Sequence, residues 1–206
     1  MLDALKSEVL RYAMKMAHAG LVPNTQGNVS ARDPETGLVA ITAHDYPYDI
    51  MTPDDIVVVS LDGQVVEGRL TPSAETPVHC VTYRERPWVN GIVHAEPTYT
   101  NVLGALGLPI EPITVSLALG VGGAVPIMPF APQTGSEEFG YRMLEVMGDR
   151  RAVIWGNHGS LTIGKTLDAA FRCTVVVENS AQIYYLARRM GRPNLVGIDS
   201  QGQLYA

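Results

Sequence analysis

Short runs of β-branched residues, each about the length of one strand, recur along this chain and limit its fold more than any other feature. These runs are GNVSAR from Gly27, LVAITA from Leu38, DIVVVS from Asp55, QVVEG after Asp62-Gly63, GIVHAE from Gly91 and AVIWGN from Ala152. The Asp-Gly pair between the third and fourth runs is typical of a tight hairpin. Because segments of helical periodicity lie among the runs, the sequence predicts a mixed α/β domain.

Five segments carry the periodicity or the end signals of helices. An apolar stripe begins at Leu2 and ends at Gly20. Thr71 offers a capping hydroxyl and Pro72 suits a first helical position, so a helix is expected from Thr71-Pro72 to about Arg86. Further helices are expected over residues 98–106, 136–147 and 167–190, the last closed by Gly191 and Pro193. The apolar stretch over residues 109–132, punctuated by Gly and Pro, fits neither pattern.

The composition narrows the class of protein. With 206 residues, no internal repeat and no low-complexity linker, we expect a single domain spanning residues 1–206. A net charge of −6 with scattered Lys and Arg argues against a nucleic-acid surface. The charged first segment is unlike a signal peptide, and no apolar run is long enough for a membrane span, so we expect a cytoplasmic protein. Cys80 and Cys173 lie in apolar, helix-like stretches, which favours buried free thiols over a disulfide.

Two of the five histidines share a context that suggests a metal site. His94 ends the apolar run GIV, and His158 ends AVIWGN. Glu96 lies two residues beyond His94, so the period of a strand places both side chains on one face. Two imidazoles and a carboxylate suit Zn²⁺, and also Fe²⁺, Co²⁺ or Mn²⁺. Spacing alone leaves the alternative that each histidine is a hydrogen-bonded core residue.

Glu75 is the carboxylate nearest the start of the helix expected after Pro72. With Thr71 as N-cap, Glu75 lies one position too late for a capping box. A first-turn carboxylate that stabilises the helix dipole is the simpler interpretation. His79 lies one helical turn further on, where it would either orient Glu75 or pack in the core.

Five segments in order make the chain similar to the class II aldolase/adducin family, which includes L-fuculose-1-phosphate aldolases and L-ribulose-5-phosphate 4-epimerases. They are QGNVSAR at 26–32, YDIMTPDDIVVVSLDG at 48–63, TPSAETPVH at 71–79, RPWVNGIVHAE at 86–96 and NHG at 157–159. The resemblance covers residues 5–192 and implies a three-layer α/β/α fold with a mainly antiparallel central sheet. It also implies a homotetramer with active sites at the subunit interfaces.

The resemblance further implies how the site works. His94 and His158 match family histidines that hold a divalent metal, and Glu75 matches the acid/base, which can also approach the metal. A cation that chelates a ketone and its neighbouring hydroxyl polarises the carbonyl. It also offsets the charge of the enediolate left by C–C cleavage, while Glu75 transfers a proton.

The chain departs from the family pattern at three places. Glu96 stands where the family has a second histidine of an H-x-H pair, and we expect it to complete the coordination. Thr42-Ala43-His44-Asp45 replaces a T-x-S-G phosphate loop, and an Asp there repels phosphate. This leaves Asn28, Ser30, Thr42, His44 and Ser73 as the candidate substrate-binding residues. Val115 stands in place of a tyrosine proton donor, and Tyr205 is a candidate to reach a neighbouring subunit.

These residues lead to three hypotheses about function. The first is a metal-dependent carbon–carbon lyase, an aldolase acting on a small hydroxy-ketone, a sugar phosphate or a related carboxylate. The second is a decarboxylase, dehydratase or epimerase, because all of these enzymes stabilise related anions on the metal. The third is a non-catalytic scaffold like adducin, in which H-A-E is a decayed site. Metal content separates the last hypothesis from the first two.

Overall fold

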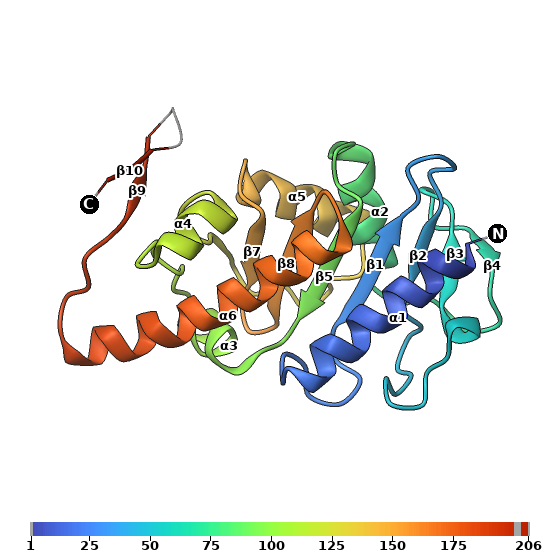
Figure 1. Cartoon of the computed structure of the whole chain (residues 1–206), viewed down its shortest axis with the longest axis horizontal. Helices are drawn as coiled ribbons and strands as arrows, with labels where there is room; N and C mark the ends of the chain where they lie inside the picture. The colour runs from blue at the N-terminus through green and yellow to red at the C-terminus, as the bar shows by residue number, and fades with distance from the viewer. Residues whose placement is uncertain (1, 200–202, 206) are drawn as a thin grey trace.

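The computed structural model describes residues 2–199 and 203–205, and its centre is an eight-stranded sheet (Figure 1). The strand order is β4-β3-β2-β1-β5-β8-β7-β6, and every neighbouring pair is antiparallel except β6 with β7. The strands are β1 Asn28–Arg32, β2 Val39–Ile41, β3 Val57–Val59, β4 Val65–Glu67, β5 Gly91–Ala95, β6 Ile127–Met128, β7 Ala152–Trp155 and β8 Gly159–Gly164. A short hairpin of β9 Gly197–Ile198 and β10 Leu204–Tyr205 stands apart from this sheet.

Helices cover both faces of the sheet, as a three-layer α/β/α fold requires. They are α1 Asp3–His18, α2 Thr76–Glu85, α3 Thr98–Ala105, α4 Val115–Val121, α5 Glu137–Met147 and α6 Leu167–Met190, with a 3-10 turn η1 Pro53–Asp55. Helix α1 and the start of α6 pack on one face of the central strands, where Val29 and Val93 are buried. Helices α2 and α5 pack on the other face, against Ile41 and Ile92. Figure 1 shows α1 and α6 crossing the near side of the sheet. The predicted fold class is confirmed.

Strand β8 was not predicted from the sequence, although it lies in the middle of the sheet between β5 and β7. Its sequence, GSLTIG, alternates apolar residues with Ser and Thr, which resembles a half-exposed edge more than a buried strand. The structure buries all six residues. Thr162 is tolerated there because its hydroxyl hydrogen-bonds the Thr174 hydroxyl and the Ala170 carbonyl of α6.

The prediction that Thr71 and Pro72 open a helix is wrong. Pro72 forms an isolated β-bridge with Ala43, and α2 begins four residues later at Thr76. Glu75 is therefore the N-cap residue of α2 and does not lie one turn inside it, and Pro77 takes the early-helix position expected for Pro72. Thr-Pro pairs suit an extended segment as well as a helix start, so the β-bridge decided between them.

Other expected elements agree closely with the structure. Helix α6 spans Leu167–Met190, and α3 and α5 lie within one residue of their expected ends. The ambiguous stretch after α3 contains α4 and the two-residue strand β6. Cys80 on α2 and Cys173 on α6 are buried free thiols, as predicted. No helix within the described ranges combines the length and hydropathy needed to cross a membrane.

Candidate metal centre

The pairing of β5, β8 and β7 brings two imidazoles to the same end of the sheet. His94 lies on β5, where Ala95 pairs with Ser160 of β8. His158 does not end a strand. It lies in the turn after Trp155, whose carbonyl accepts a hydrogen bond from the His158 backbone N–H. The His94 and His158 ring centroids lie 5.1 Å apart.

The environment of His94 leaves one ring nitrogen free for a ligand. Nδ1 lies 3.1 Å from the Ser160 carbonyl oxygen. Because a carbonyl only accepts hydrogen bonds, Nδ1 carries the proton and the lone pair is on Nε2. The buried Trp155 indole stacks on the His94 ring, with centroids 4.5 Å apart and planes inclined by 21°. The His94 ring is thus held in both tautomer and orientation.

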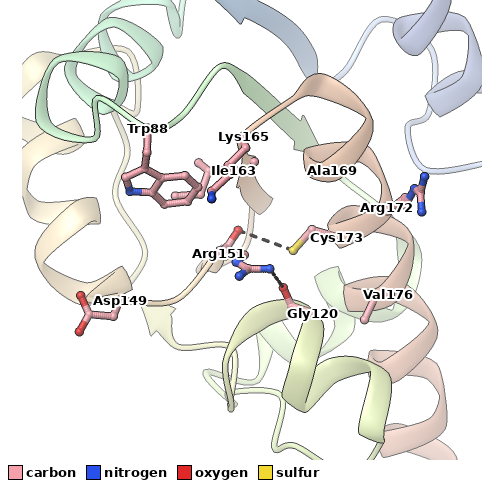
Figure 2. Close-up of a pocket in the computed structure, with 11 residues that line it drawn as sticks. Trp88, Gly120, Asp149, Arg151, Ile163, Lys165, Ala169, Arg172, Cys173 and Val176 are labelled. Carbon is pink, nitrogen blue, oxygen red and sulfur yellow. Dashed lines mark hydrogen bonds between the residues drawn. The ribbon is translucent and has the colours of Figure 1, made fainter. Parts of the chain in front are cut away.

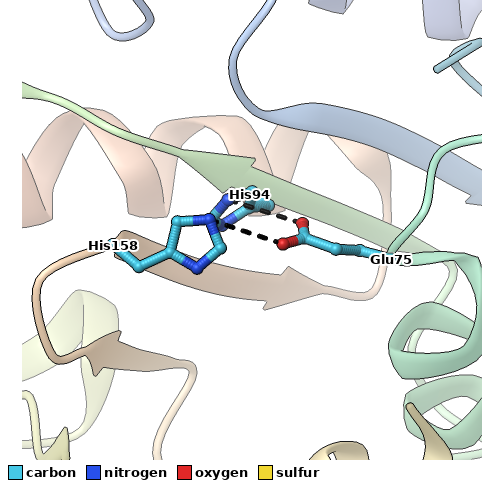
Figure 3. Close-up of side chains that lie close together, drawn as sticks. All are labelled: Glu75, His94 and His158. Atoms are coloured by element: carbon cyan, nitrogen blue, oxygen red, sulfur yellow. Dashed lines mark ion pairs between the residues drawn. The ribbon is translucent and has the colours of Figure 1, made fainter. Parts of the chain in front are cut away.

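Glu75 extends its carboxylate between the two imidazoles from the turn before α2, as Figure 3 shows. Its Oε2 lies 3.4 Å from His94 Nε2, and its Oε1 lies 3.6 Å from His158 Nε2. One ligand atom from each of these residues lies within 4.8 Å of the others. These residues are 19 and 64 positions apart in the chain, counting from Glu75 to His94 and from His94 to His158.

Two hydrogen bonds hold the Glu75 carboxylate in this position. Asn28 Nδ2 on β1 donates to Oε2 over 2.8 Å, and Thr134 Oγ1 donates to Oε1 over 3.0 Å. Burial alone would raise the pKa of Glu75, but His94, the Asn28 hydrogen bond and His158 together outweigh burial and lower it. The carboxylate form is therefore favoured among these imidazoles.

Glu96 lies on the same side of the sheet as His94, as the strand period predicted. Its Oε1 lies 4.0 Å from His94 Nε2 and 3.7 Å from His158 Nε2. Burial is the main cause that raises the pKa of Glu96, and Glu75 adds to the rise while His94 opposes it. Its role as a ligand stays a prediction.

Close backbone packing holds the Glu96 segment against the His158 turn. The Glu96 backbone N–H donates to the Leu21 carbonyl. Gly159 has φ +128°, and a Cβ there would come within 2.4 Å of the Ala95 carbonyl oxygen. Only glycine allows this approach, which keeps His158 beside the end of β5.

Burial also lowers the pKa of His158, with help from His94 and against the effect of Glu75. With 30% of its side chain exposed, His158 is the most open of the four groups around the cluster. The neutral imidazole is the form that binds a metal ion.

The five candidate substrate-binding residues occupy different environments, and their roles stay predictions. Asn28 contacts Glu75, and its Oδ1 is buried without a hydrogen-bond partner. Ser73 accepts a hydrogen bond from the Glu75 backbone N–H and so shapes the turn before α2. Thr42 is fully buried and accepts a hydrogen bond from the Val29 backbone N–H. His44 is exposed.

Ser30 belongs to an internal network beneath Glu75. Its hydroxyl lies 2.7 Å from both His79 Nδ1 and the Tyr83 hydroxyl, and all three side chains are fully buried. Burial lowers the pKa of His79 to about 3, so its ring is neutral. The network packs the α2 side of the sheet close to Glu75.

Two residues at the site were missed by sequence reasoning. Thr134 lies in the loop before α5, within the continuation of the Pro-rich stretch that has no regular pattern, so no local signal pointed to it. Trp155 ends an apolar strand, where a large aromatic is expected to be core. Only the sheet pairing shows that its ring supports His94.

Val115 and Tyr205 lie outside this cluster. Val115 is the first residue of α4 and is 48% exposed, and Tyr205 on β10 is 60% exposed. The C-terminal hairpin lies beyond the end of α6, away from the sheet (Figure 1). Neither residue contacts Glu75, His94 or His158 through a hydrogen bond or ion pair among residues 2–199 and 203–205.

An α/β/α domain that gathers two imidazoles and a carboxylate at one end of its sheet has the donor set of a divalent metal centre. The sequence profile of the Class II Aldolase and Adducin N-terminal domain matches residues 7–185. The chain belongs to this family. The resemblance inferred from the five sequence segments is therefore confirmed.

Individual relatives agree in both sequence and structure. The chain is 33% identical over 204 residues to 5-deoxy-D-ribulose 1-phosphate aldolase of Bacillus thuringiensis serovar kurstaki, covering 99% of this chain and 95% of that protein. It is similar to a solved L-fuculose 1-phosphate aldolase with a TM-score of 0.89 and 33% identity, covering 96% and 92% of the two chains. The L-fuculose-1-phosphate aldolase of Thermus thermophilus follows with a TM-score of 0.77 and 26% identity, covering 93% and 98%.

Proposed function

We propose that the protein is a divalent-metal-dependent aldolase that cleaves or forms a carbon–carbon bond in a small hydroxy-ketone. The observation that carries the proposal is the convergence of Glu75, His94 and His158 at one end of the sheet. Two of the relatives are aldolases of ketose 1-phosphates, so these sugars are the first substrates to test.

The donor set fits a metal ion. Ligands about 2.1 Å from a tetrahedral Zn²⁺ lie roughly 3.4 Å from one another. The separations of Glu75 from His94 and His158, 3.4 and 3.6 Å, are close to that value. His94 Nε2 and His158 Nε2 would hold the metal, with Glu75 or Glu96 supplying a carboxylate oxygen. Zn²⁺ is the first choice, and Mn²⁺, Co²⁺ and Fe²⁺ also accept these donors.

A bound divalent cation supplies Lewis-acid polarisation of the substrate carbonyl and offsets negative charge on its oxygens. The side chains then handle the proton. In cleavage, the hydroxyl beyond the scissile bond loses its proton, its carbon leaves as an aldehyde, and the carbon next to the carbonyl gains a proton. Glu75 is the carboxylate held to accept the first proton and return it to carbon, because Asn28 and Thr134 aim both oxygens into the cluster.

We also propose a homotetramer with sites completed between subunits. Apolar side chains that one chain leaves exposed support this, since Val115 and Leu119 on α4 are each about half exposed. The C-terminal hairpin carries exposed Leu204 and Tyr205 away from its own sheet (Figure 1). Sedimentation of the intact protein tests the assembly, and a monomer at micromolar concentration would contradict it.

Product analysis tests the aldolase proposal. Metal-free and metal-loaded protein would be incubated with ketose 1-phosphates, the matching free ketoses and 2-keto acids. We expect an aldehyde and a hydroxy-ketone fragment only from metal-loaded protein. Release of CO₂ or water in place of an aldehyde would assign a decarboxylase or dehydratase. Absence of bound metal together with absence of turnover would assign the adducin-like scaffold.

A further inference from the structure

A cavity of about 600 Å³ opens at the end of the sheet opposite to the candidate metal centre (Figure 2). Gly164 and Lys165 at the end of β8 line it, whereas the metal cluster adjoins Ser160 at the start of that strand. At ~3.3 Å per residue, the two ends of β8 lie about 16 Å apart. The cavity is therefore separate from the candidate metal centre.

The cavity carries positive charge on a chain whose net charge is −6. Lys165, Arg151 and Arg172 line it, against one carboxylate, Asp149. Arg172 is paired with Asp168 over 2.6 Å, and in Figure 2 it points away from the opening. Lys165 and Arg151 form no ion pair within the part of the chain that the structure describes. Two unneutralised cations on one opening favour an anion between them.

A tryptophan lies beside these cations. Trp88 is 40% exposed and its ring borders the cavity, as Figure 2 shows. The loop that carries Trp88 is held rigidly, because Arg32 donates to the Tyr83 and Pro87 carbonyls and to Asn90 Oδ1. A fixed, exposed indole loses little conformational entropy on binding a flat group.

The remaining wall is apolar. Ile163 of β8 and Val176 and Cys173 of α6 line the interior, with the Cys173 Sγ directed to the Arg151 carbonyl. The volume lies within the range of small-molecule sites, which combine an apolar wall with a few polar groups. The cavity thus offers a stacking face, an apolar wall and two cations.

We propose that this cavity binds a small organic anion that carries a flat apolar or aromatic group. Lys165 and Arg151 bind the anionic group, and Trp88 stacks on the flat part. The site is independent of the metal centre, so it binds its ligand in metal-free protein.

Isothermal titration of the intact, chelator-treated protein tests this site. The probes are adenosine monophosphate and 2-naphthoate, which join a ring to phosphate or carboxylate, together with adenosine and inorganic phosphate, which have only one of these parts. We expect saturable binding of at least one ring-bearing anion and weaker binding of adenosine and phosphate. Phosphate and carboxylate anions are distinguished by which of the first two probes binds more tightly.

Variants then locate the binding. We expect Lys165→Ala with Arg151→Ala to weaken binding by roughly tenfold or more, since each lost cation removes a charge-assisted hydrogen bond. Trp88→Ala should weaken the ring-bearing anions but leave phosphate unchanged. Arg142→Ala, an exposed cation on α5, is the matched control and should bind like wild type. Circular dichroism verifies that each variant is folded.

Three results would overturn the proposal. The first is that none of the four probes saturates at millimolar concentration. The second is equal binding by wild type and the Lys165/Arg151 double variant. The third is a fall in assembly mass for Lys165→Glu in sedimentation, because the cavity would then be a contact between copies of this chain.

Discussion

The indole of Trp155 lies nearly parallel to the imidazole of His94, with ring centroids 4.5 Å apart. Trp155 also lies 5.4 Å from the His158 ring and makes an edge contact with Phe139. Because it is only 1% exposed, its emission differs from that of Trp88, which is 40% exposed. The tryptophan that supports the candidate ligands is therefore also a spectroscopic reporter for them.

We expect Co²⁺ to quench the Trp155 emission when it is added to metal-free protein, because an open-shell ion at His94 Nε2 would lie next to the indole. Fluorescence titration measures this. Trp88→Phe should keep the quenching, and the double variant His94→Ala, His158→Ala should lose it. Equal quenching in the double variant would place the Co²⁺ elsewhere.

Glu75→Gln should lower kcat by roughly 100- to 10,000-fold, the range for loss of a general acid/base. The amide keeps the size of the carboxylate but cannot move a proton. Glu138→Gln, which changes an exposed glutamate at the start of α5, is the matched control and should leave kcat unchanged. Steady-state kinetics at saturating metal measure the effect, and near wild-type turnover by Glu75→Gln would remove Glu75 from the mechanism.

Glu96 decides whether the centre has one carboxylate ligand or two. If Glu96 coordinates, Glu96→Ala should weaken Zn²⁺ binding by at least about tenfold, and Glu96→His, which restores the H-x-H pattern, should bind at least as well as wild type. Competition with a chromophoric chelator measures these affinities. Unchanged affinity in Glu96→Ala would show that Glu96 turns away from the metal.

Asp55 should contribute stability that depends on pH. Its buried carboxylate accepts hydrogen bonds from Arg69 and Thr52, and these partners lower its pKa to about 2. Because the folded pKa lies below the ordinary value of 3.8, the stabilisation is fully present above that value. It is lost as the pH falls towards 2.

Asp55→Asn should therefore lower the free energy of unfolding at pH 7 by about 1–3 kcal/mol. Urea unfolding at several pH values measures the difference from wild type, which should shrink between pH 4 and pH 2. Asp54→Asn, at the exposed neighbouring position, is the control. A difference that stays constant over this pH range would contradict the assignment to the Asp55 charge.

Local patterns in the sequence were enough to predict most helices and strands. The end signals of α6, Gly191 and Pro193, and the Asp62-Gly63 turn act over a few residues, so they can be read without tertiary structure. The same is true of the ordered family segments that identified the fold. The candidates His94, His158 and Glu75 came from that ordered series, since the spacing of the histidines alone left a core role open.

Tertiary structure decided the relationships that act across long separations in the chain. The β-bridge of Pro72 with Ala43 moved the start of α2 to Thr76 and so placed Glu75 at the helix end. The insertion of β8 between β5 and β7 brought His158 beside His94, 64 residues earlier in the sequence. Thr134 reached Glu75 from a loop with no local signature. Hydrogen bonds between distant strands select one register among many, and no local propensity encodes that choice.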